Sequence, residues 1–321
     1  MGENIRIIFE NHFDTSVLED QDNAATYKEH QTGEYLMNAE MTKSPMRHNI
    51  LATKPAHVYT LRGRMVNRET LSCLAFVRPI INPEASLVFT MWNHDSDGSY
   101  TDPWDYRLRI EKVGIMPGWG QFNWEDYWGG NLAGVTRYNP MASVQAMWFD
   151  SPLYILEKYN TSTGGIDLMT GTGKTFVDNV KYWQLELDTS DIGPDTHSID
   201  RIFMGAHLPL DYTISHGHSL LFQDKGKSYR TDGGSLITTL KPRFKELSFS
   251  FSVVSPSNRQ KIAALLAHIG VHRDILVSLY PLNNQNSLEL DYSIVGKLTK
   301  VPVMSEIIGG YYKTAMKIEE T

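Results

Sequence analysis

The stretch FKELSFSFSVVSPSNRQKIAALLAHIGVHRDILVSLY, residues 244–280, commits most clearly to a structure. Its first part alternates between apolar and polar side chains, which is the period of a half-buried strand. The apolar positions are Leu247, Phe249, Phe251 and Val253, with serines between them. We therefore predict a strand whose apolar face is buried and whose serine face meets solvent.

The next residues predict a helix over 256–269. Ser255 is a good N-cap, and Pro256 fits the first helical position. Apolar residues then recur at the spacing of an amphipathic helix: Ile262, Leu265, Leu266 and Ile269. Gly270 follows where a left-handed residue ends a helix, and a second alternating strand begins at Ile275. We expect the helix to pack on the sheet to which both strands belong.

Length and composition bound the remaining possibilities. A chain of 321 residues suggests two domains. Aromatic residues make up 11% of the chain, which favours β-rich structure and large contact surfaces. The net charge is −7 and the basic residues are scattered, whereas a nucleic-acid binder needs a basic patch. We therefore expect no sequence-specific nucleic-acid binding.

The cysteine count and the apolar runs bear on the compartment. Cys73 is the single cysteine and lies in an apolar run, so no disulfide can form within the chain. The first residues lack the basic and apolar regions of a signal peptide, and no apolar run is long enough to span a membrane. Folding in the cytoplasm and no membrane span are the expectations.

The rest of the chain suggests two mainly β domains, at 1–205 and 206–321. A first strand is expected at 4–10, and the polar segment 14–55 is expected to be a long arm. Short strand patterns separated by turn residues then argue for a β-sandwich or jelly roll. These patterns lie at 57–64, 70–78, 86–93, 106–113, 180–188 and 199–204. Closing strands are expected at 288–298 and 311–319.

The arm has few large apolar residues, so it cannot bury enough surface to order itself. Its best anchors for a neighbouring subunit are Tyr35, Leu36, Met37 and Met41. We expect these side chains to make intersubunit contacts, with the arm acting as an assembly latch.

Motifs with chemical meaning are weak. Residues 169–175, MTGTGKT, resemble a phosphate-binding loop, but Leu168 stands where its first glycine should be. His216 and His218 lack a third ligand at useful spacing. No Ser/His/Asp signature or nucleophile elbow occurs, although a glycosidase carboxylate pair cannot be judged by counting. We expect no catalytic residues, no cofactor and no dedicated metal site.

One acidic turn leaves an alternative open. Asn93, Asp95 and Asp97, followed by Gly98, resemble the start of a calcium-binding loop. The twelfth position would be Trp104 rather than glutamate, and the flanking segments predict strands. The pattern fits an ordinary acidic turn or a calcium-stapled one.

An aromatic cluster in a glycine-rich segment is the best candidate for recognition. It consists of Trp119, Phe122, Trp124, Tyr127 and Trp128. Such side chains can stack on sugars or anchor a protein partner. They can equally close one end of the sandwich or pack against the next subunit, which is the interpretation we favour.

With these motifs in view, the chain resembles the minor tail proteins of long-tailed bacteriophages and prophages, specifically tail-tip, baseplate or distal-tail-like components. The resemblance covers most of the chain. It is strongest at 228–230, 242–251 and 277–281, and extends to 71–75, the aromatic segment, 182–187 and 201–205. It implies an N-terminal jelly roll similar to carbohydrate-binding modules. It also implies a C-terminal β-sandwich with one packed α-helix, related to tail-tube and distal tail proteins.

The resemblance implies a non-enzymatic structural protein of the virion, assembled in the cytoplasm of the bacterial host. We expect the C-terminal domain to form a threefold or sixfold ring around the tail conduit, with the jelly roll projecting outward. Its partners would be other copies of itself, the tail tube and other tail-tip proteins. The alternative is a receptor-recognition protein that binds host-surface glycans through Trp119–Trp128, and a glycan hydrolase is a third hypothesis.

Overall fold

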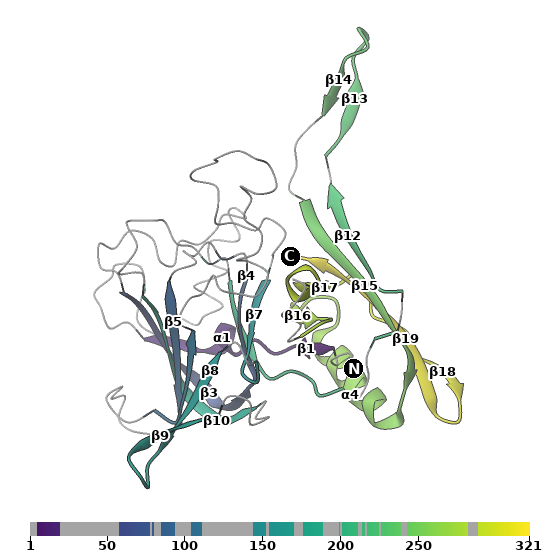
Figure 1. Ribbon diagram of the computed structural model, residues 1–321. Coiled ribbons are helices and arrows are strands. Elements are labelled where there is room, and N and C mark those ends of the chain that lie inside the picture. The colour runs from purple at the N-terminus through teal and green to yellow at the C-terminus, as the bar shows by residue number, and fades with distance from the viewer. Residues whose placement is uncertain are drawn as a thin grey trace. The chain divides into compact units, whose positions relative to one another are not determined.

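The computed structural model describes residues 5–19, 58–77, 79, 85–93, 104–110, 144–151, 154–169, 176–188, 199, 201–210, 214–215, 217–224, 226–238, 243–281 and 288–321. The chain divides into two compact units. The N-terminal unit consists of Glu10–His207 and Leu282–Ser293. The C-terminal unit consists of Met1–Phe9, Leu208–Pro281 and Ile294–Thr321. The protein is mainly β with antiparallel sheets, which confirms the predicted fold class (Figure 1).

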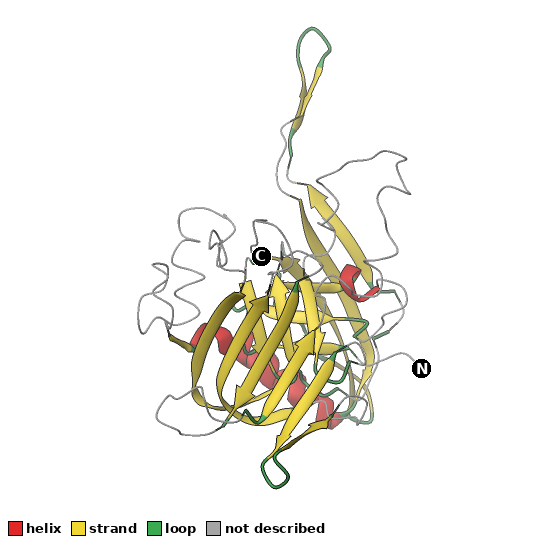
Figure 2. Ribbon diagram, turned by 60° about the vertical axis from the view of Figure 1, so that its left-hand side comes forward, coloured by secondary structure: helices red, strands yellow, loops and turns green. Residues whose placement is uncertain are grey.

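Most of the N-terminal unit consists of two sheets. The larger has seven strands in the order β2 (Val17–Glu19), β3 (Val58–Leu71), β10 (Val177–Asp188), β5 (Ser86–Trp92), β6 (Tyr106–Ile110), β8 (Ile155–Asn160) and β9 (Gly165–Leu168). The smaller has the order β11 (Arg201–Gly205), β4 (Cys73–Val77) and β7 (Val144–Trp148). Figure 2, which colours the strands yellow, shows strands lying side by side in sheets.

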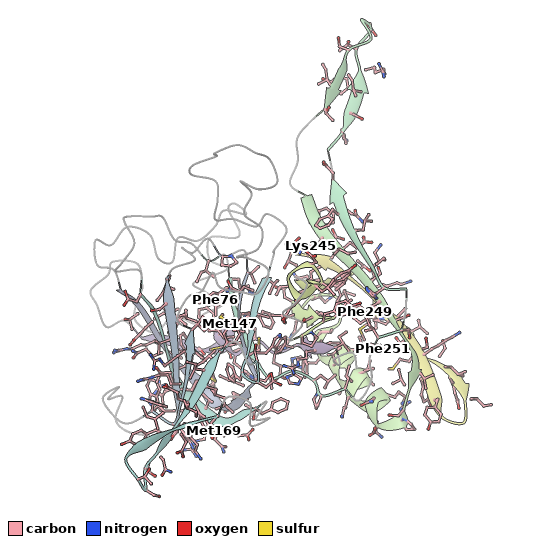
Figure 3. All side chains as sticks on the ribbon, in the orientation of Figure 1. Phe76, Met147, Met169, Lys245, Phe249 and Phe251 are labelled. Carbon is pink, nitrogen blue, oxygen red and sulfur yellow. The ribbon has the colours of Figure 1, made fainter. Side chains whose placement is uncertain are left out.

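One hydrophobic core draws on both of these sheets. Phe89 and Trp183 come from the larger sheet. Phe76 and Met147, which Figure 3 labels, come from the smaller one. Because residues of both sheets share one buried cluster, the sheets pack face to face, as in a β-sandwich. Gly63 on β3 is part of this packing, since a Cβ there would lie 2.4 Å from Trp183 Cζ2.

The first part of the predicted arm is built into this unit. Helix α1 (His12–Thr15) begins after Asn11, whose side chain accepts a hydrogen bond from the Phe13 amide. Phe13 is fully buried, and β2 pairs with β3. Residues 14–19, assigned to the arm on polarity alone, therefore have regular structure. One buried aromatic and one strand pairing outweigh the polar composition around them.

The C-terminal unit contains a second seven-stranded sheet. Its order is β1 (Arg6–Ile8), β16 (Ile275–Ser278), β17 (Ser293–Leu298), β19 (Tyr311–Glu320), β15 (Arg243–Val254) and β12 (Ser219–Asp224). Strand β18 (Ser305–Ile308) also pairs with β19. The chain passes from one unit to the other between His207 and Leu208, close to the predicted boundary at 205. Both units also include segments from elsewhere in the chain, whereas the sequence suggested continuous domains.

Helix α4 (Pro256–Ile269) forms where the sequence predicted it. The Ser255 side chain accepts a hydrogen bond from the Asn258 amide, and Gly270 has a φ of 55°. All four predicted core residues of the helix are buried: Ile262, Leu265, Leu266 and Ile269. The Arg259 guanidinium lies 5.0 Å from the centre of the Tyr312 ring on β19, so the helix packs against the sheet. Helix α5 (Leu288–Asp291) belongs to the N-terminal unit.

The predicted alternation along β15 fails at Val253. Leu247, Phe249 and Phe251 are buried, but Val253 is 51% exposed and Val254 is buried instead. Phe251 pairs with Thr314 and Val254 with Tyr312, so β15 carries one extra residue against β19. This β-bulge reverses the faces of the residues that follow it.

Candidate assembly surface

The residues that the sequence favoured for recognition lie outside the described part of the chain. These are the aromatic cluster, Trp119, Phe122, Trp124, Tyr127 and Trp128, and the arm anchors, Tyr35, Leu36, Met37 and Met41. Asp95, Asp97, His216 and most of the 169–175 motif also lie outside it. Their roles stay predictions.

Two neighbours of those motifs are described. The Asn93 amide donates a hydrogen bond to Asp105 Oδ2 at 2.8 Å, which joins the end of β5 to the residues before β6. His218 Nε2 lies 2.9 Å from the Tyr280 hydroxyl. Within the described ranges, no three His, Cys, Asp or Glu side chains are grouped so as to hold a metal ion.

A buried serine–histidine pair in the N-terminal unit was missed by sequence reasoning. Ser72 Oγ lies 2.9 Å from His207 Nδ1 and also accepts a hydrogen bond from the His207 amide at 2.9 Å. The rings of Phe176 and Trp148 pack on the imidazole. Both polar side chains are buried, and the bonds tie the start of β4 to the residues after β11. Ser72 and His207 are far apart in sequence, so no sequence motif indicated the pair. Because both side chains are buried and join two segments of the unit, we assign the pair a structural role.

The polar groups near α5 are also held inside the N-terminal unit. Glu289 accepts a hydrogen bond from Trp148 Nε1. Burial raises the pKa of the Tyr154 phenol, and the nearby carboxylate of Glu289 raises that pKa further. Tyr154 is therefore neutral at ordinary pH and serves the core.

Charged side chains on β6 and β8 interact with one another. Arg109 Nη1 lies 3.2 Å from Glu157 Oε1, and the Arg107 guanidinium lies 4.3 Å from the centre of the Trp104 ring. Burial lowers the pKa of Arg107, whereas Glu157 and Glu186 raise it. The arginine thus covers one face of Trp104, which leaves that face closed to a stacking ligand.

The N-terminal unit exposes Ile166 and Leu168 on β9, and the C-terminal unit exposes apolar side chains on two hairpins. The first is the distal hairpin, formed by β13 (Ser228–Arg230) and β14 (Leu236–Thr238). Its turn is closed by a hydrogen bond from the Thr231 amide to the Ser235 carbonyl. Arg230 Nη1 donates to the Gly234 carbonyl, and Gly234 has a φ of 79°. In Figure 1 the hairpin lies beyond the ends of β12 and β15.

The distal hairpin exposes Tyr229 and Ile237 on one face and Leu236 on the other, where Arg230, Ser228 and Thr238 accompany it. Tyr229 is paired with Ile237 and therefore shares a face with it, whereas Leu236 is paired with Arg230 on the other face. The exposed fractions are 57% for Tyr229, 59% for Leu236 and 41% for Ile237. A two-stranded hairpin that packs on nothing is only marginally stable in water. The exposed apolar side chains of the distal hairpin therefore indicate that another surface covers it.

The second is the glycine hairpin, formed by β18 and the start of β19. Gly309 and Gly310 both have positive φ values, 59° and 81°, as the tight turn between the strands requires. Glu306 Oε1 accepts a hydrogen bond from the Gly310 amide. The hairpin and the residues before it expose Val301, Val303, Ile307, Ile308 and Tyr311.

The two hairpins lie at opposite ends of β15. Asp224, just before the distal hairpin, pairs with Arg243 at the start of β15. Tyr312, just after the glycine turn, pairs with Val254 at its end. An exposed apolar surface therefore lies at each end of β15, one on the separate two-stranded sheet of β13 and β14 and the other on the seven-stranded sheet. We name these two surfaces together the candidate assembly surface.

No protein-family model matches the chain, and no curated protein matches it. No helix among the described residues is long and apolar enough to cross a membrane.

Proposed function

We propose that this protein is a non-enzymatic structural component of a phage tail tip or baseplate. The C-terminal unit forms a ring around the tail conduit, and the N-terminal unit, as a jelly roll, projects from it. Its partners are other copies of itself, the tail tube and neighbouring tail-tip proteins. The observation that carries the proposal is the distal hairpin, which exposes apolar side chains on both faces.

The position of the resemblance supports this reading. The segments that most resemble tail proteins, at 228–230, 242–251 and 277–281, include β13, most of β15 and the end of β16. The first two contribute to the distal hairpin and to the strand that joins the two apolar surfaces. Chains that carry different surfaces at their two ends assemble by heterologous contacts, which close into rings when the rotation allows.

The charges on the polar face of the C-terminal sheet are compatible with a conduit wall. Ser248 pairs with Lys317, so the lysine shares the serine face of β15. Lys317 Nζ lies 2.8 Å from Glu246 Oε1, and that pairing offsets its charge. A wall past which DNA moves must not hold phosphates tightly, and paired cations bind them less strongly than free ones.

The oligomeric state tests the proposal. We expect the purified chain to form threefold or sixfold rings, visible by negative-stain electron microscopy and measured by light scattering after size exclusion. Leu236→Asp should place a charge in the contact and shift the protein to monomers, while its circular dichroism spectrum stays that of the folded wild type because the side chain is exposed in the monomer.

Leu168→Asp is the matched control, since Leu168 is similarly exposed, at 65%, but lies on β9 of the N-terminal unit. This variant should form rings like the wild type. A wild-type chain that stays monomeric at high micromolar concentration, or a Leu236→Asp variant that assembles normally, would contradict the proposal.

A further inference from the structure

We infer that Asp232, in the turn of the distal hairpin, is a site of spontaneous isomerisation to isoaspartate. The modification uses only the amide nitrogen of the next residue, Gly233, and water. It concerns the chemistry of one turn and does not depend on the proposed function. Three observations carry it: the hydrogen bonding of the turn, the unpaired carboxylate of Asp232 and the small size of Gly233.

The turn leaves both reacting groups without hydrogen bonds. The Gly234 amide donates to the Thr231 carbonyl at 2.8 Å, which makes residues 231–234 a β-turn. Asp232 and Gly233 are its two central residues, and the bond that closes a β-turn uses the amide of neither. Among the described residues, nothing accepts a hydrogen bond from the Gly233 amide and nothing donates one to the Asp232 carboxylate.

The position of the turn favours the movement that the reaction needs. Asp232 and Gly233 are both exposed. The two strands beside them have three residues each, and a hairpin of two strands is only marginally stable in water. The turn can therefore adopt the conformation in which the amide nitrogen reaches the carboxyl carbon. Because Gly233 has no Cβ, no side chain obstructs that approach.

The reaction balances with water as its only other reagent. The Gly233 nitrogen attacks Cγ of the protonated Asp232 carboxyl, and a carbon–nitrogen bond forms. The carboxyl hydroxyl leaves with the amide hydrogen as water, which gives a cyclic succinimide. Water then adds to one of the two ring carbonyls. Opening at the former main-chain carbonyl breaks its bond to nitrogen and gives isoaspartate, whereas opening at Cγ restores aspartate.

Isomerisation should disrupt the distal hairpin. The main chain then passes through Cβ and Cγ of residue 232, so the turn becomes longer. The bond from Gly234 to Thr231 and the bond from the Thr231 amide to the Ser235 carbonyl both enclose this residue. Both bonds need the ordinary chain length, so we expect isoaspartate to weaken the pairing of β13 with β14.

Asp167 provides an internal control. It is also exposed and lies in a hairpin, on β9, but Asn160 Nδ2 donates a hydrogen bond to its Oδ2 at 3.1 Å. The next residue is Leu168, whose side chain hinders attack by its amide nitrogen. A second Asp-Gly pair, at residues 97–98, lies outside the described residues and falls on a different tryptic peptide.

Ageing of the purified full-length chain tests the inference. The chain is kept in warm, mildly acidic buffer, because loss of the hydroxyl requires the protonated carboxyl. Isoaspartate is then detected by labelling with an isoaspartyl methyltransferase, and located with a protease that cleaves before aspartate but not before isoaspartate. We expect isoaspartate to accumulate at residue 232 and not at residue 167.

Gly233→Ala separates the chemistry from the turn. A Cβ at this position would meet no atom closer than 3.9 Å, so the turn can accommodate it. The added methyl group hinders the attacking nitrogen. We expect isoaspartate at residue 232 of this variant to fall to the level found at residue 167.

The Leu236→Asp variant is aged in parallel, because it keeps the turn residues but should not form contacts that cover the hairpin. Absence of isoaspartate at residue 232 from both the wild type and this variant would overturn the inference. Equal accumulation at residues 232 and 167, or undiminished accumulation in Gly233→Ala, would also overturn it. None of these results bears on ring formation, so the inference and the proposed function can fail separately.

Discussion

His12 is a buried histidine whose ionisation should affect stability. Its Nε2 lies 3.9 Å from Glu69 Oε2. Burial lowers the pKa of His12 below 6.5, and the smaller opposing effects of Glu69 and Glu10 do not offset it. The folded state therefore takes up this proton at lower pH than the unfolded state does. Because the unfolded chain then binds more protons, the free energy of unfolding decreases as pH falls through 6.5.

We predict that His12→Gln reduces this pH dependence. The amide cannot take up a proton, so the variant should lose less stability than the wild type on acidification. Thermal unfolding of both proteins at a series of pH values measures the difference. His272→Gln is the matched control, since it makes the same substitution at an exposed histidine. Parallel curves for the wild type and His12→Gln would show that His12 does not control the effect.

Helix α4 is the element whose packing can be tested most directly. Leu266 is buried on the face that meets the core, so Leu266→Ala should lower the free energy of unfolding by about 2–5 kcal/mol. Gln260→Ala, on the exposed side of the same helix, should change it by less than about 0.5 kcal/mol. Urea unfolding measures both values. Equal small losses would mean that the Leu266 face is not buried.

For single helices and strands, the sequence predicted the features that depend on residues close together in the chain. The caps at Ser255 and Gly270 and the apolar stripe of α4 are local patterns, and all appear as expected. The face of Val253 could not be predicted, because the bulge arises from pairing with β19. Neither hairpin was predicted from the sequence. The glycine pairs Gly233-Gly234 and Gly309-Gly310 stand at their turns, but a turn does not show whether the strands beside it are covered.

The whole molecule departs from the sequence prediction because its units are discontinuous. Strand β1 was expected near the N-terminus, but its partner β16 lies far along the chain, with Ile7 paired to Val277. A short apolar strand gives no indication of which sheet it completes. The candidate assembly surface could not be predicted for a similar reason. Its two hairpins are far apart in sequence, and their positions at opposite ends of β15 follow from the strand pairing.

The discontinuity of the C-terminal unit leads to a prediction about its fragments. A fragment of residues 208–321 lacks β1 and the residue before it. In the full chain Ile7 and Ile8 of β1 and the preceding Ile5 are almost completely buried. Each such side chain contributes about 1.5–3 kcal/mol when buried, and a domain has only about 5–15 kcal/mol of stability. We therefore expect this fragment to unfold without a cooperative transition. Joining residues 1–9 to its start through a flexible Gly/Ser linker should restore cooperative unfolding.

Circular dichroism during heating distinguishes the two fragments. The linked fragment carrying Ile7→Asp is the control, because it restores the length of the chain without the buried side chain that pairs with β16. It should behave like the fragment that lacks residues 1–9. The two fragments share residues 282–293, so any difference between them comes from β1. If the unlinked fragment melted cooperatively at the same temperature as the linked one, β1 would be dispensable. Residues 208–321 would then be sufficient for the stability of the C-terminal unit.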